Sequence, residues 1–214
     1  VLLLALSLLA IMFPVQNVLM NSERSNFRNE AEIYLITINN FIENCIEDME
    51  GLCFQTEMRN KIRDYKSGKL AREQLVDFSK PNYANSASRL KNCVLVVRLV
   101  DSQVISSYGN QSIIEKTDLL KRYETYPEVD YFNYDGHPFF IVSNPLIYNQ
   151  EIIASDIAVF DLAPVVAEMN LADYQLKITA RVNLSLGQMK KIDDKLFTYD
   201  DMTWFVGNID HSNA

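Results

Sequence analysis

The chain has 214 residues, of which 48% are hydrophobic and 22% are charged, and its net charge is −8 at pH 7. No cluster of basic residues is interleaved with aromatic residues, which argues against nucleic acid as a partner. The three cysteines, Cys45, Cys53 and Cys93, are too few for a disulfide scaffold. We expect buried thiols of low reactivity, although Cys93 could pair with either of the others if the helix around them breaks near Gly51.

The first twenty residues are strongly apolar. Sixteen of them are hydrophobic, and the first charged residue is Glu23. Twenty helical residues span about 30 Å, the thickness of the hydrocarbon core of a bilayer. Neither a basic leader nor a small-x-small cleavage site is visible, and both are expected of a signal peptide. We therefore predict a transmembrane anchor over residues 1–21, in preference to a cleaved signal or a buried helix of a soluble core.

A long helix is predicted to follow over residues 22–56. Apolar residues recur there with nearly heptad spacing: Phe27, Ala31, Tyr34, Ile38, Phe41, Cys45, Met49 and Leu52. Such a stripe packs against its own domain and can also form a homodimer seam. We expect Gly51 to end this helix.

The rest of the chain alternates short helices and strands. Two helices are predicted, at residues 57–65 and 71–78, with Pro81 ending the second. The later elements expected are strands at 93–100 and 104–108, a helix at 113–123, strands at 129–134, 138–148 and 151–160, a helix at 165–170, and strands at 175–182 and 203–209. Asp135-Gly136 and Asn149-Gln150 are predicted hairpin turns.

Three segments carry a pattern of strands: residues 97–109 (VRLVD followed by VISSYG), residues 139–148 (FFIVSNPLIY) and residues 152–162 (IIASDIAVFDL). Together they resemble the PAS-like sensor domains called Cache or PDC domains. The resemblance implies an antiparallel sheet on a long N-terminal helix, serving as the extracytoplasmic sensor of a histidine kinase, a chemoreceptor or a cyclic-dinucleotide enzyme. Ser155 stands where family members usually have glycine. The Arg-x-Trp-Tyr signature of the amino-acid-binding members is absent, so amino-acid binding is not supported.

Asp156 is the leading candidate for ligand contact, because it interrupts an apolar strand at the position that the resemblance assigns to a ligand-contacting aspartate. A buried carboxylate needs a partner; the alternative is an outward-facing charge on the strand. Arg98 interrupts another apolar strand. It could hold an anionic ligand, or it could pair with Asp156 or Asp161.

Aromatic residues gather just before and along the third strand. The resemblance implies that this region walls the ligand pocket, and aromatic walls with a few polar groups are typical of such sites. The candidate ligand-binding residues there are Arg122, Tyr123, Tyr126 and Tyr131. The alternative for each tyrosine is simple packing against the sheet.

No catalytic motif, phosphate-binding glycine loop or metal-ligand cluster is visible. The two histidines, His137 and His211, are isolated, and the Asp193-Asp194 and Asp200-Asp201 pairs are expected to be solvated loops. The sequence therefore predicts a non-enzymatic region without cofactor or metal.

The sequence as a whole predicts an α+β fold with a PAS-like antiparallel sheet. Its expected organisation is an anchor (1–21), a long helix (22–56), a sensor domain (57–165) and a C-terminal extension or small membrane-proximal unit (166–214). The predicted function is extracytoplasmic sensing of a small organic ligand at the cell membrane, with signalling through the long helix. The alternative is a membrane-anchored structural or pilin-like protein without a ligand.

Overall fold

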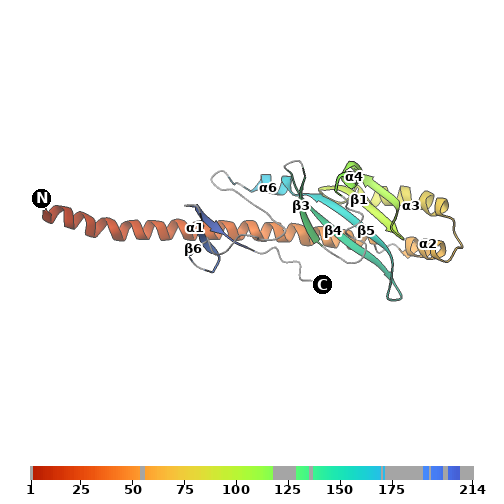
Figure 1. Cartoon of the computed structure of the whole chain (residues 1–214), viewed down its shortest axis with the longest axis horizontal. Helices are drawn as coiled ribbons and strands as arrows, with labels where there is room; N and C mark the ends of the chain where they lie inside the picture. The colour runs from red at the N-terminus through yellow and green to blue at the C-terminus, as the bar shows by residue number, and fades with distance from the viewer. Residues whose placement is uncertain are drawn as a thin grey trace. The chain divides into compact units, whose positions relative to one another are not determined.

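The computed structural model describes residues 2–53, 56–117, 129–134, 137–169, 171, 190–192, 194–199 and 202–207 (Figure 1). Side chains are described from Met12 onward, except at residues 53, 115–117, 133, 134 and 199. Its elements are α1 (Leu2–Cys53), α2 (Thr56–Lys66), α3 (Arg72–Ala87), β1 (Cys93–Val100), β2 (Gln103–Gly109), α4 (Ser112–Thr117), β3 (Val129–Tyr134), β4 (His137–Tyr148), β5 (Glu151–Asp161), α6 (Ala163–Glu168), β6 (Lys190–Lys191), β7 (Leu196–Tyr199) and β8 (Met202–Phe205). The predicted α+β class, with a long N-terminal helix and an antiparallel sheet, is confirmed.

The long helix follows the predicted apolar stripe. Ile38, Ile42, Cys45, Met49 and Leu52 are all buried, and their spacing of three and four residues keeps them on one face. The prediction that the helix ends at Gly51 is wrong, because α1 continues to Cys53. Burial of Leu52 favours this last turn despite the cost of a glycine within the helix.

The anchor over residues 1–21 stays a prediction. Among the residues that the structure describes, no helix is both long enough and apolar enough to cross a bilayer.

The chain divides into two compact units, and α1 contributes to both. One unit combines α1 up to Asn40 with a small antiparallel sheet in the order β6-β7-β8. Lys195, just before β7, donates a hydrogen bond to Glu32 of α1 over 3.1 Å. The hydrogen bond from Lys195, together with one from Arg28, lowers the pKa of Glu32. No strand was predicted where β6 and β7 lie, because strands of two and four residues are too short to show a pattern.

The second unit is built around a five-stranded antiparallel sheet in the order β2-β1-β5-β4-β3. The central strands β1 and β5 are buried along most of their length, and both consist largely of apolar residues. The predicted hairpin turn at Asn149-Gln150 is confirmed, because both residues have the positive φ angles, 49° and 67°, that a two-residue turn requires. The turn predicted at Asp135-Gly136 lies outside the described residues, although the flanking Tyr134 and His137 pair with each other.

Helices cover both faces of this sheet. On one face, α4 contributes Ile113 to a core that includes Val97 and Ile157. On the other face, α2 and α3 contribute Ile62 and Leu75. The end of α1 lies on that second face too, and its Phe41 ring meets Phe140 of β4 edge-on at 5.6 Å.

Pro81 does not end a helix, contrary to the sequence prediction, and α3 continues to Ala87. Pro81 lies on the exposed side, where water can solvate the carbonyl that loses its helical partner. Every fourth residue of the opposite side is buried, namely Leu75, Ser79, Tyr83 and Ala87. Packing of this stripe outweighs the lost hydrogen bond.

Other predicted elements have mixed outcomes. The helix at 113–123 is confirmed as far as Thr117, and the helix at 165–170 corresponds to α6. The last strand ends at Phe205, earlier than expected. The strand at 175–182 lies outside the described residues.

Replacing either of two glycines by alanine should change the free energy of unfolding, with opposite signs at the two positions. Gly109 has φ +98°, and a Cβ there would overlap the Val94 carbonyl, whereas a Cβ at Gly51 would meet nothing within 4 Å. We expect Gly109→Ala to lower the free energy of unfolding by more than about 1 kcal/mol, and Gly51→Ala to raise it by about 0.5–1 kcal/mol. Urea denaturation measures both, and equal effects would contradict the geometry at Gly109.

Candidate functional site

A row of polar side chains crosses the face of the main sheet that α2 and α3 cover. Arg98 of β1 lies opposite Ser106 of β2 on one side and Asp156 of β5 on the other. Asp156 in turn lies opposite Asn144 of β4. Because directly paired residues point to the same face, four neighbouring strands contribute one polar residue each to this row.

Arg98 and Asp156 form a bidentate ion pair at the centre of the row. Nε of Arg98 donates to Oδ1 of Asp156 over 2.8 Å, and Nη2 donates to Oδ2 over 2.6 Å. Their side chains are only 1% and 0% exposed. This fork-to-fork geometry gives the strongest hydrogen bonds that such a pair can make, which offsets the cost of removing both charges from water.

Two helices also bind the ion pair. Tyr83 of α3 donates its hydroxyl to Oδ1 of Asp156 over 3.2 Å, and its ring lies 4.8 Å from the Arg98 guanidinium carbon. Nη2 of Arg98 donates to the Leu52 carbonyl, 3.3 Å away, in the last turn of α1. Carbonyls in a last turn lack helical partners and carry the negative end of the helix dipole, so a cation is favourable there.

A second polar contact joins α3 to the same row. The Ser79 and Ser106 hydroxyls share a short, buried hydrogen bond. Ser79 precedes Tyr83 by four residues, so both project from one face of α3. The row therefore joins β1, β2 and β5 to α3 and to the end of α1.

The structure resolves the alternatives that the sequence left open for the two charges. Asp156 is fully buried, so it is not an outward-facing charge. Arg98 pairs with Asp156 rather than with Asp161. Contact of either residue with a ligand stays a prediction.

Tyr131 lies on β3, opposite Phe140, on the same sheet face as Asp156. Along β5, its row is four residues from Asp156, or about 13 Å in a strand. The structure therefore does not bring these two candidates together. Arg122, Tyr123 and Tyr126 lie outside the described residues, and their roles stay predictions.

Sequence reasoning missed Tyr83, Ser79 and the Leu52 carbonyl. The predicted helix ended before Pro81, so Tyr83 was not expected on its packing face. The four-residue spacing from Leu75 through Ser79 to Tyr83 was the signal that could have identified it.

Two thiols lie within the same unit. Cys45 is buried, Cys93 is half-buried, and both are free. Burial raises the pKa of each thiol to about 12. Because the thiolate is the reactive form, the raised pKa values favour low reactivity for these two cysteines, which stays a prediction.

The described residues contain no group of three or more His, Cys, Asp or Glu side chains that could hold a metal ion. Comparison of the chain with protein-family models and with curated proteins finds no match.

A double-mutant cycle tests the ion pair. Asp156→Asn or Arg98→Met alone should each lower the free energy of unfolding by about 3–5 kcal/mol, because each leaves a buried charge without its counter-ion. The double variant should lose less than the sum, as coupled partners do. The exposed Lys66–Asp101 pair is a control: Lys66→Met should cost at most about 1 kcal/mol. Additive losses at Arg98 and Asp156 would contradict direct pairing.

The raised thiol pKa values predict slow labelling. At pH 8, an aromatic disulfide reagent should modify Cys45 and Cys93 at least about 100-fold faster in urea than in the folded chain. Because the folded pKa of about 12 lies above the ordinary 9.0, the stability from the neutral thiols is present below pH 9 and lost as pH rises towards 12. A Cys53→Ser background leaves only these two thiols, and adding Cys45→Ser or Cys93→Ser to it assigns each rate. Equal rates with and without urea would contradict burial.

Proposed function

We propose that the chain is the extracytoplasmic ligand-sensing region of a membrane-anchored signal-transduction receptor, and that it signals through α1. The observation that carries this proposal is the link from the sheet to α1: the ion pair in the sheet core binds the last turn of the helix through the Leu52 carbonyl. A change in the sheet around β1 and β5 therefore acts directly on the helix.

The order of elements supports the sensor class. A long helix, two helices, two strands, a short helix and three antiparallel strands follow one another, as the resemblance to Cache domains predicts. The five strands form one sheet with helices on both faces.

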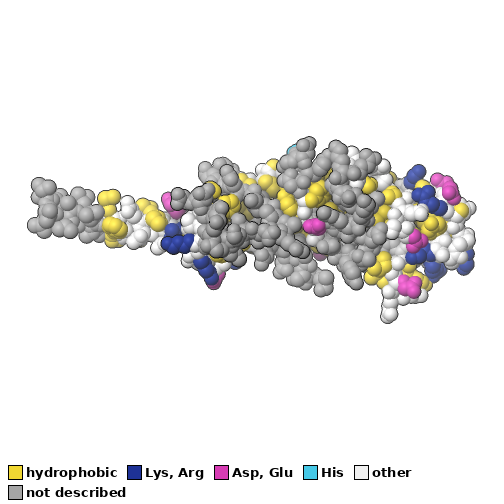
Figure 2. Space-filling view, in the orientation of Figure 1, with side chains coloured by type: hydrophobic (Ala, Val, Ile, Leu, Met, Phe, Trp, Pro, Cys, Tyr) yellow, Lys and Arg dark blue, Asp and Glu magenta, His cyan; other side chains and the backbone are white. Residues whose placement is uncertain are grey.

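Exposed apolar residues on α1 support the membrane anchor. Six of the nine residues at 12–20 are large, exposed hydrophobic side chains, and Figure 2 shows apolar side chains on this part of the helix. They are Met12, Phe13, Val15, Val18, Leu19 and Met20. Exposed apolar side chains gathered in this way are unfavourable in water and are typical of contact with lipid or with another protein.

The proposed mechanism is a shift of population between two arrangements of the sheet and helix. A small organic ligand that binds one arrangement more tightly favours it, and the Arg98–Leu52 hydrogen bond transmits the difference to α1. The chain itself supplies no catalytic step in this mechanism, and no cofactor is needed.

A thermal-shift screen tests ligand sensing. The full chain in lipid nanodiscs is mixed with amino acids, carboxylates, amines, sugars and purines. A ligand at 100 times its dissociation constant should add about 2.7 kcal/mol of stability, which raises Tm by several degrees. If no compound in the library raises Tm and the chain assembles into filaments, the alternative of a structural or pilin-like protein would be favoured.

Hydrogen exchange tests the proposed coupling between the sheet and α1. Ligand should change hydrogen exchange in the last two turns of α1 in the wild-type chain. Arg98→Lys keeps the charge but lacks the planar fork, so it should reduce this change at least about fivefold even with the ligand saturating. Arg63→Lys, at a residue that bonds to Tyr148, is the matched control and should leave the change intact. An unaltered response in Arg98→Lys would overturn the coupling route.

A further inference from the structure

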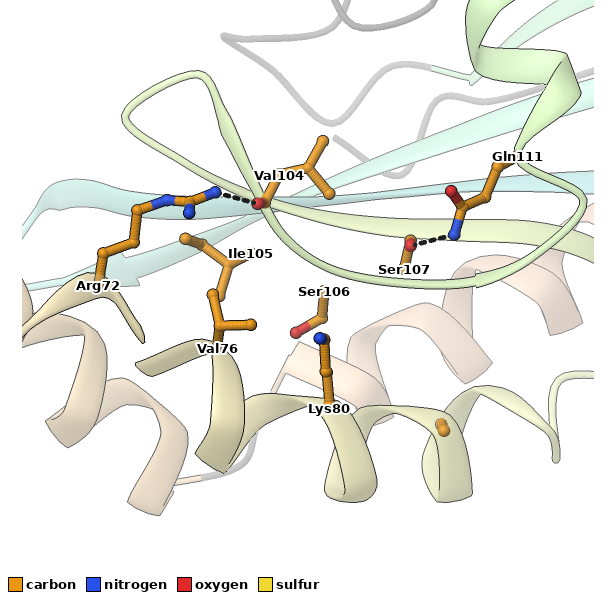
Figure 3. A pocket seen from close by; sticks show the side chains of 9 residues that line it. Arg72, Val76, Lys80, Val104, Ile105, Ser106, Ser107 and Gln111 are labelled. Carbon is orange, nitrogen blue, oxygen red and sulfur yellow. Dashed lines mark hydrogen bonds between the residues drawn. The ribbon is translucent and has the colours of Figure 1, made fainter. Parts of the chain in front are cut away.

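An open groove lies between α3 and β2. In the described part of the chain, β2 is an edge strand of the five-stranded sheet, and α3 packs beside it. The groove has a volume of about 550 Å³ (Figure 3). The groove shares Ser106 with the polar row, but neither Arg98 nor Asp156 lines it. In the described part of the chain, its walls are the outer side of α3 and the edge of β2.

The α3 wall carries two cations on either side of an apolar residue. Arg72, Val76 and Lys80 line the groove at four-residue intervals, so they share one helix face. Arg72 and Lys80 are about 12 Å apart along the helix axis. Figure 3 shows both side chains projecting from α3 towards β2. Among the described residues, no carboxylate forms an ion pair with either of them.

The β2 wall carries backbone groups that point away from the sheet. The Asn110 N–H donates to the Val94 carbonyl of β1 over 2.8 Å, which orients residue 110 towards β1. Backbone groups alternate along a strand, so those of Gly109 and Ser107 point outward. The Val104 carbonyl also points outward and accepts from Arg72 over a long 3.3 Å. An edge of this kind is a template for a further strand.

We propose that this groove binds an extended, acidic segment of a partner protein, which adds to the edge of β2 as a further strand. Backbone hydrogen bonds to β2 hold the segment, and side chains that face α3 select its sequence. Same-side residues in a strand repeat every 6.7 Å or so, and residues four apart span about 13 Å. This span matches the separation of Arg72 and Lys80, and it places the residue midway opposite Val76.

The groove therefore fits the pattern acidic-x-apolar-x-acidic. The local charge favours such a segment, because Arg72 and Lys80 are exposed cations that line the groove. The surface outside the groove is mixed: Figure 2 shows Lys and Arg side chains interspersed with Asp and Glu over α2 and α3. A small anion would use one cation and none of the strand edge, so the combined features favour a peptide.

Fluorescence anisotropy tests the proposal with the full chain in a mild nonionic detergent. The probe is a fluorescein-labelled peptide, Thr-Thr-Glu-Thr-Val-Thr-Glu-Thr-Thr. Saturable binding is expected at low salt and should weaken as salt is added. The double variant Arg72→Glu with Lys80→Glu should weaken binding at least about tenfold, because like charges then face each other.

Two controls distinguish addition of a strand at the groove from general attraction between charges. Lys69→Glu with Arg89→Glu changes the net charge equally at exposed sites outside the groove, and it should leave the affinity within about twofold. The same peptide with alternate backbone amides N-methylated keeps its charges but cannot pair along one edge, and it should lose binding. No saturable binding of the unmodified peptide, equal binding of the N-methylated peptide, or equal competition by glutarate would each overturn the proposal.

Discussion

The pairing of Arg98 with Asp156 is the constraint on which the main unit depends. Two charges that are almost fully buried need each other, and their bidentate geometry requires β1 and β5 to lie side by side in one register. The Arg98 guanidinium also donates a hydrogen bond to the Leu52 carbonyl, and the Asp156 carboxylate accepts one from the Tyr83 hydroxyl. The positions of α1 and α3 on the sheet thus follow partly from one ion pair, with the apolar cores packed around it.

Much of the sheet could be predicted from local patterns. The bounds of β1 and β3 match the prediction because runs of β-branched and aromatic residues end at clear turns. Helix α3 could not be predicted to its end, because burial of Tyr83 and Ala87 outweighs the local effect of Pro81. β6 and β7 were missed because strands of two and four residues carry too little periodicity.

The candidate site was partly visible in the sequence. Arg98 and Asp156 were identifiable as charges within apolar strands, but their pairing depends on the register of two strands that are 58 residues apart. No local pattern encodes that register. The Leu52 carbonyl is a backbone group, which a residue pattern cannot single out, and the arginine and tyrosines at 122–126 lie outside the described residues.

The order of strands in the sheet has a consequence for synthesis of the chain. β1 pairs at once with β2 through a tight turn, but its other neighbour, β5, is translated much later. At about 5–20 residues per second, the 58 residues from Arg98 to Asp156 take about 3–12 seconds to emerge. During that interval the nascent β1–β2 hairpin exposes an apolar strand with an arginine still in water, which delays burial of the strand until its counter-ion arrives. Because burying Arg98 without its counter-ion is costly, the pairing disfavours burial of this strand before β5 is available.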